Sequence, residues 1–456
     1  MKTRLFDRRG FLQTAGLGLA APVIAPGLRA QPAAGNPGRL RHACIGVGGM
    51  MGATDLKNFL AHPDTDVVAI CDVDSQFLEK AHARAPGART YSDWREMLEK
   101  ERGKTDSVSI TVPDHMHAAI AMTAMRAGYH IYCQKPMCHN VAEVRALTEM
   151  ARSSGVVTQL GTQHASGIGD RTTVQLLRDG AIGKIRHVHL VANRSNIERY
   201  RMANPPLKAE PAPAHLDWDK WLGVAAHSDY APDVYHPSLW RSWMDFSTGW
   251  SGDIGCHLFN AVWRSLGLTA PRSIIAEVQE TWKDSAARRL GNWPQSNHII
   301  WRFSGNDMTA GDELVLEWHD GEFYPPEEIR AIHSGKFPEE GVIYIGTEGS
   351  LLQPHTSGPI LYPREKFKDL LRPKLEPHNH YHAFLDACLG RCEAVSSFDF
   401  SGPMTESILL GTVAVRLPDT LLEWDAPAMK FPNHPAADAL LHRTYRDGWQ
   451  VEGLGS

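Results

Sequence analysis

Residues Ala43-Cys-Ile-Gly-Val-Gly-Gly-Met-Met-Gly52 decide the first half of this fold. An apolar run ends there in closely spaced glycines, and a second apolar run that starts at Val67 ends in the carboxylate Asp72. A strand, a glycine-rich turn, a helix, a strand and an acid in this order are typical of a dinucleotide-binding βαβ unit. The glycines let backbone N–H groups approach a pyrophosphate at the helix N-terminus, and the acid accepts hydrogen bonds from ribose hydroxyls.

One position departs from the usual Gly-x-Gly-x-x-Gly pattern. Met51 stands where the third glycine is expected, and Gly52 follows one residue later, so the turn is expected to be looser or shifted by one residue. The alternative is a glycine-rich turn that binds nothing. Asp72 favours NAD over NADP as the cofactor, since a carboxylate repels a 2′-phosphate. The expected cofactor-binding residues here are Gly46, Gly48, Gly49, Met50 and Asp72.

Extended and helical patterns alternate from residue 40 to residue 160. Short connections between them imply right-handed crossovers and a parallel, doubly wound sheet. Ligands of such sheets bind at the carboxyl ends of the strands, where Gly46, Asp72, Pro113 and Lys135 all fall. The predicted strands are 43–46, 67–71, 107–111, 129–133 and 156–160, and the predicted helices are 55–60, 75–85, 93–100, 118–127 and 141–153.

Beyond residue 161 the pattern changes to that of a second sheet. Its predicted strands are 274–282, 298–303, 313–318, 341–345 and 350–352, followed by helices at 379–390 and 402–415. We therefore predict an α/β fold: a Rossmann domain with a doubly wound parallel sheet (40–160), then an α/β domain with an open, largely antiparallel sheet (161–400). A C-terminal helix and tail (401–456) are expected to pack back on these domains.

The first thirty residues are of a different kind. Asp7-Arg-Arg-Gly-Phe-Leu12 places paired arginines before an apolar run that is broken by Pro22 and Pro26. This is typical of a twin-arginine signal peptide and too short for a membrane span, so we predict a signal peptide (1–30), a linker (31–39) and a periplasmic or otherwise exported protein. A chance Arg-Arg in a cytoplasmic leader is the alternative. Because the periplasm holds no pool of free nicotinamide nucleotide, an exported enzyme is expected to carry its cofactor tightly bound.

Composition limits the remaining function classes. The chain has 456 residues, 43% of them hydrophobic and 22% charged, with a net charge of −5 and no basic stripe, which argues against nucleic-acid binding and, after signal removal, membrane insertion. Seven scattered cysteines show no zinc or disulfide spacing. His378-Asn-His-Tyr-His382 offers alternate histidines, but Asn379 is a helix-start residue and no carboxylate has ligand-like spacing, so no metal site is expected.

A family resemblance is carried by Val112-Pro-Asp-His-Met-His117, Tyr132-Cys-Gln-Lys-Pro136 and Gly252-Asp-Ile-Gly-Cys-His257. These segments resemble signatures of the glucose–fructose oxidoreductase/inositol dehydrogenase family (Gfo/Idh/MocA). Ser401-Gly-Pro-Met-Thr-Glu406 and Leu422-Glu-Trp-Asp425 are similar to the tail of its exported twin-arginine branch. The resemblance implies a Rossmann domain, a second domain whose open sheet forms a homo-oligomer, and hydride transfer at a sugar or polyol hydroxyl.

Lys135, Asp253 and His257 are the expected catalytic residues. Oxidation of an alcohol needs a base for the hydroxyl proton while hydride leaves the carbon, and lysine or histidine suits this role. Asp253 and His257 are spaced i, i+4 and share one face of a helix, where the carboxylate can orient the imidazole or the lysine. The resemblance implies that Lys135 bridges cofactor and substrate. A surface lysine, a helix cap and a core histidine are the structural alternatives.

Further contacts are expected from the surrounding loops. Six of the thirteen tryptophans lie between Trp218 and Trp263, where they either stack on a sugar ring or pack the second domain. The other expected cofactor contacts are Pro113, His117, Gln134, Lys135 and Gln163, and the expected substrate contacts are His164, Tyr235, His236 and Arg241.

Two departures from the family pattern keep the function open. Gln134 replaces a glutamate, which removes a negative charge beside Lys135, and Asn260 stands where an aspartate is common. Three functions remain. The first is an NAD(P)-dependent oxidoreductase acting on a ring hydroxyl of a sugar, polyol or glycoside. The second is a redox-neutral glycoside-processing enzyme with tightly held NAD, and the third is a non-catalytic nucleotide-binding relative.

Overall fold

Two sheets organise the chain, as predicted. The computed structural model describes residues 38–193, 207–333 and 337–455. A six-stranded parallel sheet is followed by an eight-stranded mixed sheet that is mostly antiparallel, so the predicted α/β fold class is confirmed. The predicted signal peptide and most of the predicted linker lie outside the described residues.

The first sheet has the strand order β3-β2-β1-β4-β5-β6. The order reverses between β1 and β4, and such a switch point opens a crevice outside the carboxyl ends of the strands. The short, largely exposed β3 was missed by the sequence prediction. The strands are β1 (Leu40–Ile45), β2 (Thr65–Cys71), β3 (Arg89–Tyr91), β4 (Ser107–Ile110), β5 (His130–Gln134) and β6 (Thr158–Gly161).

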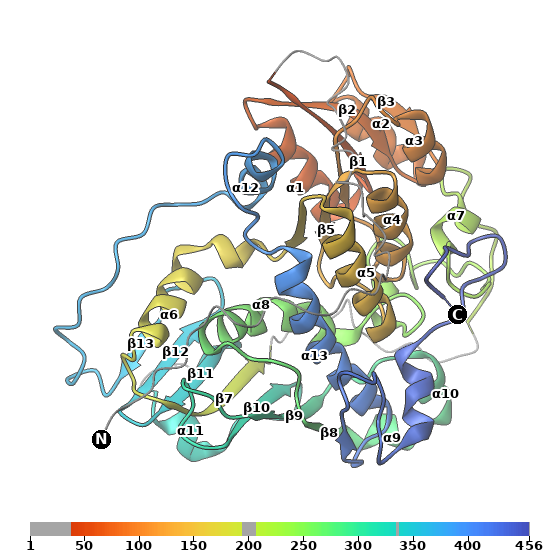
Figure 1. The fold of residues 1–456 in the computed structure, drawn as a ribbon. Coiled ribbons are helices and arrows are strands. Elements are labelled where there is room, and N and C mark those ends of the chain that lie inside the picture. Colours follow the sequence, from red (N-terminus) through yellow and green to blue (C-terminus); the bar gives the residue numbers. More distant parts are fainter. Residues whose placement is uncertain (1–37, 194–206, 334–336, 456) are drawn as a thin grey trace, which may run out of the picture. The chain divides into compact units, whose positions relative to one another are not determined.

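Five helices connect these strands (Figure 1). Asp74, Asp93 and Asn140 cap α2, α3 and α5 with their side chains. The first and fourth helices start several residues before their predicted starts, because the glycine turn and Asp114 belong to their first turns. The helices are α1 (Gly49–Leu60), α2 (Ser75–His82), α3 (Trp94–Lys100), α4 (Asp114–Arg126) and α5 (Val141–Ser154).

The second sheet has the order β13-β12-β11-β7-β10-β9-β8-β14, in which only the β7–β10 pair of the described strands is parallel. The strand predicted at 274–282 ends at Val278, since the short helix α9 (Glu280–Lys283) starts two residues later. The strands are β7 (Ile185–Ala192), β8 (Ser273–Val278), β9 (Asn297–Ser304), β10 (Glu313–Asp320), β11 (Glu340–Gly346), β12 (Ser350–Pro354), β13 (Ile360–Tyr362) and β14 (Leu422–Glu423).

Two long, mostly buried helices cover one face of this sheet. Helix α8 (Gly249–Leu266) contacts β7, and α13 (Phe398–Arg416) contacts β8, β9 and also α5 of the first half (Figure 1). Side chains alternate along β9: Ile299, Trp301 and Phe303 are buried, whereas the residues between them are only partly buried. One sheet face therefore belongs to the core, and the other remains more accessible.

Shorter elements complete the chain. The sequence did not predict α6, which connects the two sheets. Among the helices with described positions, none combines the length and apolar character of a membrane span. These elements are η1 (Gln163–Ser166), α6 (Ile168–Arg178), α7 (Trp218–Leu222), η3 (Leu239–Ser242), α10 (Ala286–Gly291), α11 (Glu327–Ala331), α12 (His380–Cys388) and η4 (Pro435–Leu441).

Candidate active site

A cavity of about 1050 Å³ lies at the carboxyl ends of β1, β2, β4 and β5. This is where open α/β sheets bind their ligands. Both halves of the chain contribute to its wall. The sequence-predicted residues that line it are Gly46, Gly48, Gly49, Met50, Asp72, Pro113, Gln134, Lys135, Gln163, His164, His236, Arg241, Asp253 and His257.

The glycine turn forms a cradle that side chains would fill. A Cβ atom on Gly46 would lie 2.2 Å from the Thr111 carbonyl oxygen, and one on Gly48 would lie 2.0 Å from Phe77. Gly52 packs on the backbone of the β1–α1 turn, where a Cβ would come within 2.7 Å of Val47. The role of the third glycine is therefore shifted by one residue and not lost. The turn fits a pyrophosphate at the N-terminus of α1.

Asp72 holds this turn in place. Its Oδ2 accepts hydrogen bonds from the backbone N–H groups of Val47 and Gly48, both at 2.9 Å. Its Oδ1 accepts a third from the N–H of Asp74 at 3.0 Å. Burial nevertheless raises the pKa of Asp72 to about 6. The carboxylate thus orders the glycine turn while it lines the cavity at the position expected for a ribose.

Asp74 connects the second half of the chain to the same end of the cavity. His236 Nε2 lies 2.9 Å from Asp74 Oδ2, and His215 Nδ1 lies 3.1 Å from Oδ1. Backbone hydrogen bonds Ser75 N–H to His215 O (2.8 Å) and Asp217 N–H to Val73 O (3.0 Å) strengthen this connection. His236 was predicted to contact substrate, but the structure places it at the end of β2, beside the ribose position.

Lys135 follows β5, at the opposite end of the cavity. Its Nζ donates a hydrogen bond to a carboxylate oxygen of Asp253 and another to the backbone oxygen of Asp253, the latter at 3.1 Å. Arg241 Nε lies 3.5 Å from the other carboxylate oxygen, and its guanidinium stacks 4.2 Å above the ring centre of Trp240. Asp253 therefore lies between two cations, both of which reach the cavity wall.

Asp114 is a cavity residue that the sequence did not single out. It is buried, and its Oδ2 accepts hydrogen bonds from the N–H and the hydroxyl of Thr248, both at 3.1 Å. Burial and the nearby Asp253 carboxylate raise the pKa of Asp114 to about 7, against the opposing effect of Arg241 and Lys135. A carboxyl with this pKa can exchange a proton near neutrality.

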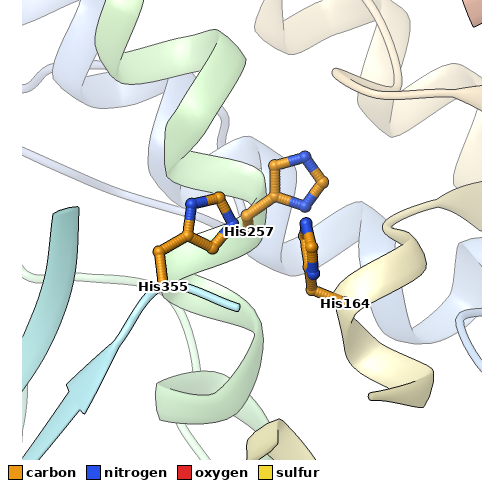
Figure 2. Close-up of side chains that lie close together, drawn as sticks. All are labelled: His164, His257 and His355. Carbon is orange, nitrogen blue, oxygen red and sulfur yellow. The ribbon is translucent and has the colours of Figure 1, made fainter. Parts of the chain in front are cut away.

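Three histidines meet beside Lys135 (Figure 2). His257 on α8, His164 on η1 and His355 after β12 have ring centres 4.5 to 5.5 Å apart. Burial lowers the pKa of His164 to about 4 and that of His257 well below its ordinary value, with a further contribution from Lys135 to the second. These two rings are therefore neutral at physiological pH. His355 was missed because it follows a strand far along the chain, with no local motif.

Gln134 lines the cavity, but its side chain does not alter the charge beside Lys135 as the sequence suggested. Its Nε2 donates to Asp55 Oδ2 at 2.8 Å, and the Thr111 hydroxyl donates to the same oxygen at 2.8 Å. Burial raises the pKa of Asp55 to about 6. A glutamate at 134 would place two carboxyl groups in contact, so the amide suits its neighbour.

Asn260 has a similar neighbour. It is buried on α8, away from the described cavity wall. Burial raises the pKa of the neighbouring Asp170 to about 7, and the Asn260 side chain partly opposes this rise. An aspartate at 260 would therefore face another buried carboxyl group. Neither departure from the family pattern removes a group from the Lys135 end of the cavity.

Two predicted contacts are absent from the described cavity wall, namely His117 and Tyr235. The ring nitrogens of His117 lie 2.7 Å from Pro136 O and 2.9 Å from Val112 O, so this residue lies beneath the site and positions its loops. Tyr235 is buried in a hydrophobic cluster with several tryptophans. The aromatic segment is thus divided: Trp221, Trp240 and Trp250 line the cavity, and the others pack the domain.

The histidines around residue 380 belong to a helix start, as predicted. Asn379 caps α12, and its Oδ1 accepts hydrogen bonds from the N–H groups of Tyr381 at 3.0 Å and His382 at 3.2 Å. His380 is buried, with Nε2 2.9 Å from Leu160 O and Nδ1 2.8 Å from the Ser166 hydroxyl.

The sheet order, the glycine cradle and the cavity define a Rossmann-type nucleotide-binding protein with a second, ligand-facing domain. Two family models agree: "Oxidoreductase family, NAD-binding Rossmann fold" matches residues 40–162, and "Oxidoreductase family, C-terminal alpha/beta domain" matches residues 174–302. Together they match more than half of the chain. The chain belongs to the Gfo/Idh/MocA oxidoreductase family.

Similar proteins include a D-glucoside 3-dehydrogenase of Escherichia coli, 25% identical over 32% of this chain and 41% of the relative. A glycosyl hydrolase family 109 protein of Stenotrophomonas maltophilia is 29% identical over 37% of this chain and 39% of the relative. The chain thus spans less than half the length of these curated relatives. A solved inositol dehydrogenase homologue of Azotobacter vinelandii, complexed with NADH and myo-inositol, covers 85% of this chain and 98% of its own with TM-score 0.56 and 16% identity.

Proposed function

We propose that this protein is an NAD-dependent oxidoreductase that acts on a ring hydroxyl of a sugar, polyol or glycoside. One observation carries the proposal: a single cavity joins the glycine turn and Asp72 to Lys135, Asp253 and His257. The cavity therefore offers a place for a dinucleotide beside candidate groups for proton transfer. The names of the relatives above support the same class of substrate.

The residues at the Lys135 end account for the proton chemistry. Bound at the glycine turn, a nicotinamide nucleotide supplies the hydride acceptor. Lys135 in its neutral form takes the hydroxyl proton, and its ammonium form returns the proton in the reverse direction. Asp253 fixes the lysine, and Arg241 on the other side of Asp253 offers hydrogen bonds to substrate oxygens.

Cofactor specificity and retention follow from the β2 end. The carboxylate of Asp72 would repel a 2′-phosphate, which favours NAD over NADP. The hydrogen bonds of His215 and His236 to Asp74 close the second half of the chain onto this end, which supports tight binding. The same observation favours a second candidate, a redox-neutral glycoside-processing enzyme that oxidises, eliminates and re-reduces on one retained NAD.

Purified protein tests these functions. The nucleotide released on denaturation is identified by mass spectrometry, and turnover of glucosides, inositols and free sugars is measured with and without added NAD. We expect NAD in the released fraction and Lys135-dependent turnover. Turnover that needs no added NAD selects the redox-neutral cycle, and turnover that strictly needs it selects the dehydrogenase. Absence of nucleotide and of turnover would contradict both and leave a non-catalytic relative.

We further propose export by the twin-arginine pathway, on the Arg8-Arg9 pattern of the sequence. A fusion of residues 1–39 to a folded reporter is expected to reach the periplasm, and an Arg8→Lys/Arg9→Lys fusion is expected to stay in the cytoplasm. Equal periplasmic signal from both fusions would contradict the proposal.

The accessible face of the second sheet supports a homo-oligomer. On β9 and β10 the partly buried residues include His298, Ile300, Val315 and Glu317, which form a mixed polar and apolar surface. We propose that a second copy covers this face, and that carbohydrate is the substrate partner with no nucleic acid bound. Sedimentation of the wild type is expected to show an oligomer, and Ile300→Glu is expected to dissociate it.

A further inference from the structure

The three histidines beside Lys135 have the arrangement of a metal-ligand set. His164, His257 and His355 each offer one ring nitrogen, and these nitrogens all lie within 4.8 Å of one another. All three residues line the cavity. Figure 2 shows the rings converging from a 3-10 helix, the long helix α8 and the end of a strand, so the backbone anchors of the cluster are independent.

Two ring nitrogens in this cluster make no hydrogen bond within the described protein. Nδ1 of His257 and Nε2 of His355 are buried and lack a hydrogen-bond partner among the described residues. A buried polar atom left unsatisfied destabilises the folded state, so such atoms in a native fold call for an explanation. A bound ion that accepts their lone pairs provides one.

A carboxylate orients one of the rings. His355 Nδ1 lies 2.7 Å from Glu340 Oε2, and Glu340 is itself largely buried at 7% exposure. With Nδ1–H donated to Glu340, the lone pair of His355 Nε2 faces the cluster. Metal-bound histidines commonly donate their second N–H to a carboxylate in this way, which fixes the tautomer and makes the ring a better ligand.

The charges around the cluster also suit a cation. The neighbouring positive charge of Lys135 is compensated by its pairing with Asp253. Ligation of zinc at about 2.0–2.1 Å sets the nitrogens about 3.4 Å apart, so small ring rotations complete the site.

A second histidine cluster in the same chain provides the contrast. His187, His189, His298 and His319 surround Glu317 on the accessible face of the second sheet. There Glu317 lies 2.7 Å from both His187 Nε2 and His298 Nε2, and His189 Nδ1 lies 3.1 Å from His319 Nε2. The Glu317 carboxylate thus lies between the rings of this cluster, although His187 Nε2 makes no well-directed hydrogen bond within the described protein. The crevice cluster has no carboxylate among its three converging nitrogens.

We propose that His164, His257 and His355 bind a divalent transition-metal ion of the zinc class, with an open coordination position toward the crevice. Three histidines and an open position are the ligand set of a site that holds a small oxygen ligand. That oxygen would be a hydroxyl or carbonyl of the sugar bound beside Lys135, and this role of the metal rests on the proposed function. The site selects substrates with two neighbouring oxygens, one for the ion and one for Lys135.

Metal content tests the proposal without reference to activity. Full-length protein is stripped with a chelator, reloaded separately with Zn²⁺ and Co²⁺, and analysed by elemental mass spectrometry and by the visible spectrum of the cobalt form. We expect about one ion per chain and a low-symmetry cobalt spectrum that changes when a polyol is added. His355→Ala is expected to abolish this ion, and Glu340→Gln to weaken its binding roughly 10- to 100-fold.

The control is the double variant His187→Gln/His298→Gln in the sheet cluster, which is expected to keep the ion. A folded wild type that takes up no stoichiometric ion would overturn the proposal. So would an ion that His355→Ala retains, or one that only the sheet variant loses. Nucleotide content is measured in the same samples: NAD without an ion contradicts the metal site alone, and an ion without NAD contradicts the proposed function alone.

Discussion

The two ends of the cavity differ in how their polar groups are used. At the β2 end, Asp72 and Asp74 accept several hydrogen bonds each, from the glycine turn and from His215 and His236. At the β5 end, His257 and His355 have buried nitrogens without a described partner. Three strand spacings, about 14 Å, separate β2 from β5.

This contrast separates groups that bind the cofactor from groups that take part in the reaction. Fully bonded carboxylates define a rigid shape and favour one bound orientation, whereas unsatisfied groups are available to substrate, proton or ion. We therefore expect changes at the β2 end to weaken cofactor retention and changes at the β5 end to weaken turnover.

The largest effect is expected at Lys135. Lys135→Met removes the proton acceptor while it preserves most of the side-chain volume, so we expect kcat to fall by about 10²–10⁴-fold with cofactor content unchanged. Single-turnover kinetics and released nucleotide are measured on the same sample. Lys208→Met, at a lysine with 86% exposure, is the matched control and should retain full activity. Near-normal turnover in Lys135→Met would contradict the assignment.

At the β2 end the expected effect is on binding. The hydrogen bond between His236 and the charged Asp74 side chain is worth about 1.5–3 kcal/mol. The variant His236→Gln weakens this bond, and Asp74→Asn removes its charge assistance. We expect the Kd for NAD to rise roughly 10- to 100-fold, with kcat at saturating NAD within a few-fold of wild type. Isothermal titration and stopped-flow release of the nucleotide measure the two quantities. A fall in kcat with unchanged Kd would instead give the β2 end a role in turnover and none in NAD binding.

Gln134→Glu tests the explanation of the family departure. It replaces an amide donor by a carboxyl beside Asp55, so we expect a loss of about 1–3 kcal/mol in the free energy of unfolding. Crowded carboxyls have raised folded-state pKa values, and the folded state then binds more protons than the unfolded state. The loss should therefore grow from pH 5 to pH 8. Urea unfolding measures it, and exposed Gln76→Glu is the control. A loss that is independent of pH would argue against two facing carboxyls.

The smallest effect is expected on the stability of the first sheet, at the buried His42. Burial lowers the pKa of His42 on β1 to about 3, so the unfolded state takes up a proton near pH 6.5 and the folded state does not. The contribution of neutral His42 to the free energy of unfolding is therefore fully present above pH 6.5. It is lost as the pH falls toward 3, by about 1.4 kcal/mol per pH unit. Urea unfolding from pH 7 to pH 5 should show a shallower dependence in His42→Asn than in wild type or in the exposed-site control His227→Asn. The same pH dependence of the free energy of unfolding in His42→Asn and wild type would contradict this role of His42.

The sequence predicted the first sheet well because its determinants are local. Gly46, Gly48, Asp72 and the strand–helix alternation lie within one βαβ unit, and the structure confirms the strands, the helices and their order. The sequence prediction missed β3, which has only three residues, and it also missed β7. The open question of Met51 was decided by one contact, the approach of Gly52 to Val47.

Side-chain partners were harder to predict. His236 was expected near the substrate and pairs with Asp74, Tyr235 was expected in the cavity and packs in a hydrophobic cluster, and Gln134 faces Asp55. Each outcome depends on a residue far away in the sequence. No spacing rule connects His355 with His257 and His164, so the three-histidine cluster was invisible before the fold was known.

By itself the sequence determined the βαβ nucleotide fold and the fold class. These follow from backbone requirements and hydrophobic periodicity, which act over neighbouring residues. Only the tertiary structure decided which polar groups are satisfied and which are left unpaired, because that balance depends on chain segments brought together by packing. The chemistry proposed for the β5 end rests on this second kind of information.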